Sequence, residues 1–240
     1  MLTTLSDFKC NTFNFEDREA IIVFPKVKAN GNWVLKTEYW GAFPDVEIKL
    51  LEKGFHVAFV QNKSRFAPKS ECELKARFVK YISKEYGLNE KCVPIGMSCG
   101  GAHAVRFAGF YPELVLCMYI DAPVLNFCDF PGKVGKPEFE KAWEEEFLSV
   151  YPGVKRYQLL KFSEHPINMT DILIENKIPI IMVYGAEDNT VSYTENGFLL
   201  ENAMVECDFL KVIKVEYRGH HPHGMTDENS PIVDFITSHC

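Results

Sequence analysis

Two long apolar runs constrain the fold of this chain more than any other feature. They cover residues 115–120 (VLCMYI) and 178–184 (IPIIMVY), and neither alternates between apolar and polar positions. A strand with this pattern is typically buried on both faces, as in a parallel sheet covered by helices. Shorter strand-like runs lie at 55–60 and 93–97, and segments with helical spacing such as 71–86 separate the runs. The sequence therefore predicts an α/β fold with a mostly parallel sheet between two helical layers.

The other segments follow the same alternation of strand and helix. Further strands are expected at residues 8–15, 20–25, 33–37 and 212–217. Further helices are expected at residues 44–52, 100–110, 139–148, 194–205 and 231–238. Since no internal repeat or low-complexity linker interrupts the 240 residues, we expect a single domain over residues 1–240.

One stretch, at about 126–168, departs from this alternation. It contains no strand-like run, but it has a charged segment at 136–146 and many aromatic residues. The aromatic residues are Phe127, Phe130, Phe139, Trp143, Phe147, Tyr151 and Tyr157. An ordinary crossover with one long helix is the simpler interpretation, but such connections need fewer residues than this stretch holds. The sequence therefore favours a helical cap inserted over the edge of the sheet.

Charge and hydrophobicity exclude several classes of protein. The net charge is −7, from 26 Lys and Arg against 33 Asp and Glu, and no block of basic residues occurs. Binding to nucleic acid or to an anionic membrane depends on clustered Lys and Arg, so neither is expected. No apolar run reaches the roughly 18 residues that suggest a membrane span.

The cysteines and the first residues bear on localisation. The eight cysteines are scattered and form no CxxC pair, which indicates reduced thiols in a reducing compartment. The first residues, MLTTLSDFKC, lack the basic and then apolar layout of a signal peptide. These features predict a cytoplasmic protein.

The most specific motif is GMSCG at residues 96–100, between a predicted strand and a predicted helix. It matches the G-x-S-x-G turn, in which small residues let strand and helix approach closely and hold the serine hydroxyl out of the sheet. We therefore expect Ser98 to be a nucleophile. Cys99 is the alternative, but its position just inside the helix favours a role for its backbone N–H, which would stabilise an oxyanion.

A serine nucleophile needs a base, and the base needs a carboxylate that orients it. Asp188 follows the apolar strand at 178–184, so it is expected at the same edge of the sheet as Ser98. Its neighbour Glu187 is a possible substitute. Asp121 is a further candidate, because it also stands at the carboxyl end of a strand.

The base is expected after the last strand, where the sequence reads RGHHPHG at 218–224. His220 is the first histidine after that strand, and the resulting order is Ser, Asp, His. His221 and His223 stay open as alternative bases. A metal site using His220 or His221 with His223 is the competing interpretation, but no acidic residue at a diagnostic spacing accompanies them. A plain solvent-exposed polar turn is the third interpretation.

These motifs together resemble the α/β-hydrolase superfamily over nearly the whole chain. GMSCG resembles its nucleophile turn, YGAEDNTV its acid turn and RGHHPHG its histidine loop. Within the superfamily, the stretches WVLKTEYWGAFP, KLLEKGFHVAFV and DAPV are similar to bacterial acetylxylan-esterase-like and prolyl-oligopeptidase-like serine hydrolases. The resemblance implies a three-layer sandwich with a mostly parallel sheet.

The resemblance also indicates where the second oxyanion donor lies. Most hydrolases of this kind carry a His-Gly pair after the third strand, but here that place holds Lys36, Thr37, Glu38 and Tyr39. A backbone amide near Glu38 is then the expected donor. The Glu38 side chain would alternatively orient a substrate hydroxyl or cap the next helix.

These observations predict a serine hydrolase that cleaves a small ester, with a short acyl group and possibly a carbohydrate alcohol, through an acyl-enzyme. The aromatic residues Trp33, Tyr39 and Trp40, together with those of the proposed cap, are candidates to line its pocket. No metal or organic cofactor is needed. A peptidase or amidase of the prolyl-oligopeptidase type is one alternative, and a binding protein that has lost catalysis is another. The oligomeric state stays open, and a homo-oligomer is possible.

Overall fold

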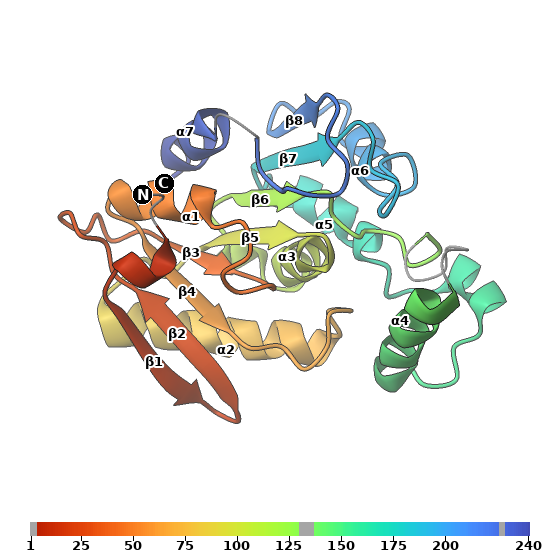
Figure 1. Cartoon of the computed structure of the whole chain (residues 1–240), viewed down its shortest axis with the longest axis horizontal. Helices are drawn as coiled ribbons and strands as arrows, with labels where there is room; N and C mark the ends of the chain where they lie inside the picture. The colour runs from red at the N-terminus through yellow and green to blue at the C-terminus, as the bar shows by residue number, and fades with distance from the viewer. Residues whose placement is uncertain (1–3, 130–136, 226–228) are drawn as a thin grey trace.

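The computed structural model describes residues 4–129, 137–225 and 229–240. Its centre is an eight-stranded sheet (Figure 1) with the order β1-β2-β4-β3-β5-β6-β7-β8. The strands are β1 (Cys10–Phe15), β2 (Arg18–Val23), β3 (Trp33–Lys36), β4 (His56–Val60), β5 (Val93–Met97), β6 (Met118–Asp121), β7 (Ile180–Gly185) and β8 (Leu210–Val215). β1 and β2 run antiparallel to their neighbours, and all other pairs from β4 to β8 are parallel.

Helices cover both faces of this sheet. Side chains of α1 (Asp45–Glu52) and α7 (Ser230–Ser238) join the apolar cluster on one face. The cluster on the other face takes side chains from α2 (Lys69–Tyr86), α3 (Cys99–Phe110), α5 (Thr170–Glu175) and α6 (Gly197–Ala203). Short 3-10 helices lie at η1 (Leu5–Asp7), η2 (Pro112–Leu114), η3 (Arg156–Lys161) and η4 (Pro166–Met169). Among the helices that the structure describes, none has the length and hydrophobicity that a membrane crossing requires.

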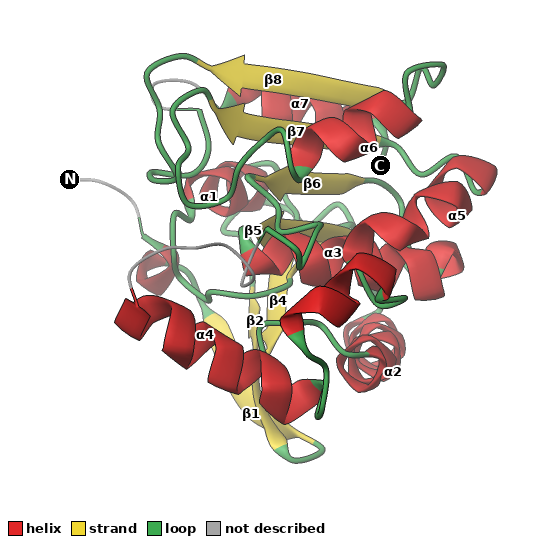
Figure 2. Ribbon diagram, turned by 90° about the vertical axis from the view of Figure 1, so that its right-hand side faces the viewer, coloured by secondary structure: helices red, strands yellow, loops and turns green. Residues whose placement is uncertain are grey.

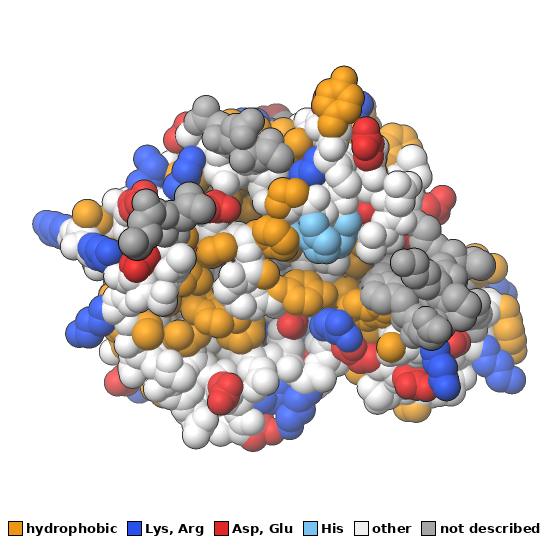
Figure 3. All heavy atoms as spheres, in the orientation of Figure 1, with side chains coloured by type: hydrophobic (Ala, Val, Ile, Leu, Met, Phe, Trp, Pro, Cys, Tyr) orange, Lys and Arg blue, Asp and Glu red, His pale blue; other side chains and the backbone are white. Residues whose placement is uncertain are grey.

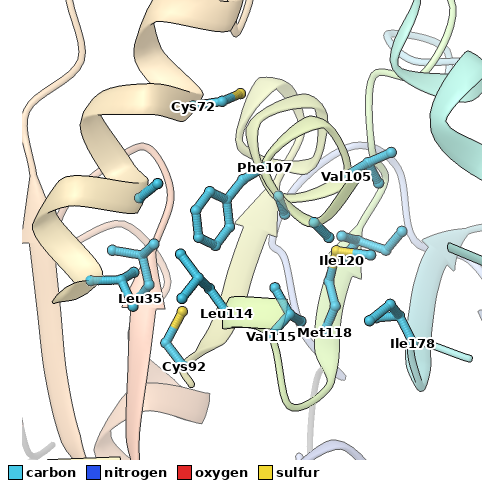
Figure 4. Packing of buried hydrophobic residues seen from close by; sticks show 14 of the residues in the cluster. Leu35, Cys72, Cys92, Val105, Phe107, Leu114, Val115, Met118, Ile120 and Ile178 are labelled. Atoms are coloured by element: carbon cyan, nitrogen blue, oxygen red, sulfur yellow. The ribbon is translucent and has the colours of Figure 1, made fainter. Parts of the chain in front are cut away.

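The central strands are apolar on both faces because each of their faces meets one helical layer. In β6 and β7, Ile120 and Met182 point to the layer of α2 and α3, whereas Tyr119 and Ile181 point to the layer of α1 and α7. Figure 4 shows the first of these layers, where Phe107 of α3 packs towards the sheet. The predicted three-layer α/β sandwich with a mostly parallel sheet is therefore confirmed.

Several predicted boundaries are corrected by the structure. The strand predicted at 115–120 begins only at Met118, because Val115 makes no more than an isolated bridge with Cys92. The helix predicted at 194–205 is shortened to α6, since residues 193–196 form turns and the helix ends at Ala203. The sequence patterns gave no expectation of α5 or of the 3-10 helices.

The segment 126–168, predicted as a cap, contains helices and loops in the part that the structure describes. Its longest helix, α4 (Pro137–Val150), lies apart from the three layers, on the side to which the parallel strands point (Figures 1 and 2). Phe127 and Phe147 pack in a third apolar cluster with Phe66 from the loop after β4. Tyr157, in contrast, is 70% exposed. Phe130 and the side chain of Phe139 lie outside the described residues.

Candidate active site

The turn between β5 and α3 holds Ser98 in a backbone conformation that L-residues rarely adopt, with φ 54° and ψ −121°. Such a turn needs glycines beside it. A Cβ on Gly96 would lie 2.2 Å from the Gly100 carbonyl oxygen, and a Cβ on Gly101 would lie 2.3 Å from the Pro123 Cβ. The small residues therefore allow the strand, the helix and the next loop to meet behind the serine.

The close approach at Gly96 makes a clear prediction. We expect Gly96→Ala to lower the free energy of unfolding by about 1–3 kcal/mol, because the methyl group would overlap backbone atoms that cannot move independently. Urea denaturation followed by circular dichroism measures this loss. Gly219→Ala is the matched control, since its Cβ would find its nearest neighbour at 3.8 Å. Equal unfolding midpoints for the two variants would contradict this reading of the turn.

Three side chains expected to act together do meet in the structure. The Ser98 Oγ lies 3.1 Å from His220 Nε2, and His220 Nδ1 lies 2.7 Å from Asp188 Oδ2. The other Asp188 oxygen, Oδ1, accepts hydrogen bonds from the backbone amides of Thr190 at 2.8 Å and Val191 at 2.9 Å. The chain thus brings together the end of β5, the end of β7 and the loop after β8, although 122 residues separate the serine from the histidine.

The Asp188 carboxylate is held in its ionised form. Burial alone would raise the pKa of Asp188, but the hydrogen bond and charge of His220, together with the two backbone amides, bring it below its ordinary value. An ionised carboxylate only accepts hydrogen bonds, so His220 Nδ1 donates and Nε2 is left with a lone pair towards Ser98. The neighbour Glu187 is exposed.

Asp121, the rival acid, makes a different set of contacts. Its two oxygens accept hydrogen bonds from both terminal nitrogens of Arg218, at 2.7 and 3.0 Å. They also accept from His223 Nδ1 at 3.1 Å and from the Gly224 amide at 2.7 Å. Asp121 is completely buried, and of these two carboxylates it is Asp188 that contacts His220. Asp121 therefore anchors the loop that carries the histidines.

The pKa of Asp121 also links it to stability. Burial would raise this pKa, but the hydrogen bond and charge of His223 and the charge of Arg218 outweigh burial and lower it. A carboxyl with a lowered pKa stabilises the fold above its pKa in the unfolded chain. That contribution is lost as the pH falls through the lower pKa of the folded state.

The two other histidines of the loop differ in exposure. His223 is buried, whereas His221 is exposed and stacks on Phe43 with ring centroids 5.5 Å apart. One ring nitrogen from each of His220, His221 and His223 lies within 4.8 Å of the others. The loop after β8 therefore brings all three imidazoles together, and of the three His221 is the exposed one. Figure 3 shows histidine side chains there, bordered by hydrophobic ones.

A pocket of about 270 Å³ opens in front of Ser98. Its walls are formed by Tyr39, Ala42, Phe43, Arg65, Met97, Ser98, Trp143, Thr190, His220, His221 and His223. Tyr39 was expected here, but the expectation for Trp33 is wrong, because that side chain is fully buried and donates to the Asn89 carbonyl. Trp40 stacks on Phe59, outside this pocket.

Trp143 lines the pocket, as expected of the aromatic residues of the cap segment, whereas Arg65 is a pocket residue that the sequence motifs did not indicate. The Arg65 guanidinium lies over the Trp143 ring, 3.7 Å from its centroid, and pairs with Glu146 of α4. These contacts join the loop after β4 to α4. No local motif indicates these contacts, because Arg65 and Glu146 lie 81 positions apart in the chain.

The two predicted oxyanion residues, Cys99 and Glu38, lie beside the serine turn. Cys99 begins α3, where the first N–H groups of a helix have no acceptor within the helix. The Glu38 carboxylate accepts from Asn62 Nδ2 at 2.5 Å and is not part of the pocket wall. The alternative that the Glu38 side chain caps the next helix is wrong, since the residue before α1 is Pro44. The Glu38 backbone nitrogen, however, lies near Gly100, at 3.6 Å from where a Cβ on that glycine would be.

Comparison with known proteins gives structural matches alone: no family model matches the sequence, and no curated protein sequence does. The acylaminoacyl peptidase of Pyrococcus horikoshii superposes with a TM-score of 0.71 and 11% identity, over 99% of this chain and 42% of that one. Dipeptidyl peptidase 4 of Porphyromonas gingivalis superposes with a TM-score of 0.69 and 13% identity, over 97% of this chain and 35% of that one. MGS-MChE2, an α/β hydrolase enzyme from a lagoon-sediment metagenome, superposes with a TM-score of 0.55 and 18% identity, over 95% of this chain and 96% of that one.

At these identities the likeness shows the fold. The chain has the α/β-hydrolase fold, as the sequence motifs implied, with its serine turn, acid and histidine at the carboxyl ends of the parallel strands. It spans about a third of the length of the dipeptidyl peptidase structures it matches, 35% in each of two cases, and nearly all of the metagenomic hydrolase, 96%.

Proposed function

We propose that the protein is a serine hydrolase with Ser98 as nucleophile, His220 as base and Asp188 as the residue that orients the base. The chain of hydrogen bonds from Ser98 Oγ to His220 Nε2 and from His220 Nδ1 to Asp188 carries this proposal. The distances of 3.1 and 2.7 Å are within the range for proton transfer and for orientation of the ring. The pocket in front of Ser98 supplies space for a substrate.

The reaction follows from these contacts. Ser98 Oγ attacks the acyl carbon and its proton passes to His220 Nε2, while the carbonyl oxygen becomes an oxyanion. The tetrahedral intermediate collapses, the bond to the alcohol breaks, and the alcohol takes the proton from His220. Water then gives a proton to His220 and attacks the acyl-enzyme, which releases the acid and returns the proton to Ser98.

The oxyanion needs two donors near Ser98. We assign the first to the Cys99 amide and the second to the Glu38 amide, because both backbones meet at the serine turn. The Tyr39 hydroxyl is a further polar group here, in contact with the Cys99 side chain. The variant Tyr39→Phe distinguishes the Glu38 amide from the Tyr39 hydroxyl as the second oxyanion donor. An unchanged kcat supports the Glu38 amide, and a loss of kcat of about 10²–10³-fold would assign the second donor to the Tyr39 hydroxyl.

A small ester with a short acyl group is the proposed substrate. The pocket of about 270 Å³ is small, and its walls combine aromatic and apolar side chains with the three imidazoles. A peptidase is the second candidate, favoured by the likeness to structures described as dipeptidyl and acylaminoacyl peptidases. The two candidates share the same reacting groups and differ in the leaving group.

A substrate panel separates these functions. We expect p-nitrophenyl acetate to be hydrolysed with a higher kcat/KM than the butyrate and the octanoate. Aminoacyl p-nitroanilides are expected to react more slowly than any of the esters. Faster turnover of the anilides would overturn the esterase assignment in favour of a peptidase. No turnover of either class, together with no labelling by a fluorophosphonate, would support a catalytically inactive binding protein.

We also propose that the helices of residues 126–168 act as a cap that limits the acyl chain. Trp143 of α4 forms part of the pocket wall, and Arg65 and Glu146 hold that helix against the loop after β4. The apolar cluster beneath α4 includes Phe66 and Phe147, with ring centroids 5.3 Å apart. The cap thereby contacts the pocket through the Trp143 side chain of α4.

Trp143→Ala tests the cap. Removing the indole enlarges the pocket, so we expect the ratio of kcat/KM for octanoate to that for acetate to rise by roughly tenfold. Tyr157→Ala is the matched control, because it removes an aromatic residue of the same segment that is 70% exposed. An acyl preference that changes equally in both variants, or in neither, would contradict the cap.

A further inference from the structure

The histidine loop has a feature that ester hydrolysis does not require. A triad uses one histidine, but three imidazoles meet here, with one ring nitrogen of each within 4.8 Å of the others. Their ring centroids are 4.7 to 5.1 Å apart, and all three pairs are edge-to-face. All three rings also line the pocket, so the cluster can be reached from solvent.

Two of these imidazoles are oriented by buried carboxylates. His220 donates its Nδ1 proton to Asp188, and His223 donates its Nδ1 proton to Asp121. In both rings Nε2 is therefore the unprotonated nitrogen with a lone pair. Carboxylates behind histidines in this way fix the tautomer and raise the basicity of the ligating nitrogen in metal sites.

The third imidazole, His221, is free to adjust. It is exposed and stacks on Phe43, and among the described residues its ring nitrogens have no hydrogen-bond partner. Tetrahedral Zn²⁺ with Zn–N bonds of about 2.0–2.1 Å holds its nitrogen ligands about 3.4 Å apart. The three nitrogens already lie within 4.8 Å of one another, and rotation of the exposed His221 ring would bring its nitrogen closer to those of His220 and His223.

We propose that His220, His221 and His223 form a binding site for a divalent transition-metal ion such as Zn²⁺, and that the bound ion inhibits the enzyme. Three neutral imidazoles are a ligand set that Zn²⁺ accepts, with a fourth position left to water. The ion would occupy the lone pair of His220 Nε2 that receives the proton of Ser98. The inhibitory part rests on the proposed function, whereas the binding part does not.

Calorimetric titration of Zn²⁺ into the metal-free protein tests binding without any turnover. We expect one ion per chain at this site, with affinity lowered at least about tenfold by His221→Ala. His239→Ala is the control, because it removes an exposed histidine at the end of α7, and it should bind as the wild type does. Ser98→Ala keeps all three imidazoles and should also keep the affinity. Equal affinity in His221→Ala and wild type would overturn the site.

The rate at which a fluorophosphonate labels Ser98 tests inhibition. We expect saturating Zn²⁺ to slow labelling of the wild type at least about tenfold, and a chelator to restore the rate. Mg²⁺ should have no effect, since it prefers oxygen ligands. Zinc binding at the histidines without slower labelling would refute the inhibitory role. Absent labelling with intact zinc binding would instead count against the hydrolase assignment alone.

Discussion

Asp188→Asn is expected to lower kcat about 10⁴-fold while leaving the fold intact. The reason lies in the contacts of the two carboxylate oxygens. Oδ1 accepts hydrogen bonds from the amides of Thr190 and Val191, so the asparagine oxygen takes this position. The asparagine NH₂ then faces His220 Nδ1 and donates to it. His220 must carry its proton on Nε2, and it can no longer accept the proton of Ser98.

Glu187→Gln provides the matched control for this experiment. It makes the same chemical change at the next residue, where the side chain is exposed. Steady-state kinetics with p-nitrophenyl acetate measures both variants, and thermal unfolding checks that both are folded. A kcat for Asp188→Asn within threefold of that for Glu187→Gln would show that Asp188 does not orient the base.

Asp121→Asn is expected to have its largest effect on stability instead. Asp121 and Arg218 are 0% and 1% exposed in their side chains and are joined by two hydrogen bonds. Neutralising the carboxylate leaves the guanidinium charge buried without its counter-ion, which costs about 3–5 kcal/mol. His223 and the Gly224 amide also lose an ionised acceptor. Denaturant titration measures the free energy of unfolding.

The double variant Asp121→Asn, Arg218→Met checks that reason. If the uncompensated charge of Arg218 is responsible, removing it should recover part of the lost free energy of unfolding. If Arg218→Met lowers the free energy of unfolding as much in the Asp121→Asn background as in the wild type, the two residues do not act as a coupled pair. A loss of kcat at Asp121→Asn exceeding that at Asp188→Asn would return Asp121 to the role of triad acid.

Local patterns carried most of the information about the fold. The central strands β5, β6 and β7 are short and almost wholly buried, and their apolar pattern depends only on neighbouring positions along the chain. The start of β6 was predicted too early because Val115 and Leu116 are apolar without belonging to the continuous ladder. The helix α5 has too few residues to show a helical spacing of apolar positions, so the sequence pattern did not predict it.

In the candidate site, too, local motifs identified some residues, whereas others depended on contacts between distant segments. Ser98, Asp188 and His220 were selected because a turn at the carboxyl end of a parallel strand has a recognisable composition. The choice between Asp188 and Asp121 depended on which carboxylate faces which ring, and the loop after β8 decides this by placing His220 and His223 on different acids. The walls of the pocket depended on packing between distant segments, which explains why Trp33 was misassigned.

The most direct test of the account is covalent labelling of the wild type with a fluorophosphonate, followed by mass spectrometry of the labelled peptide. We predict one phosphonyl group per chain, on Ser98, and loss of both labelling and p-nitrophenyl acetate hydrolysis in Ser98→Ala. Ser238→Ala, which removes an exposed serine at the end of α7, should label as the wild type does. Labelling at another residue, or ester hydrolysis that persists in Ser98→Ala, would contradict the assignment of Ser98 as the nucleophile.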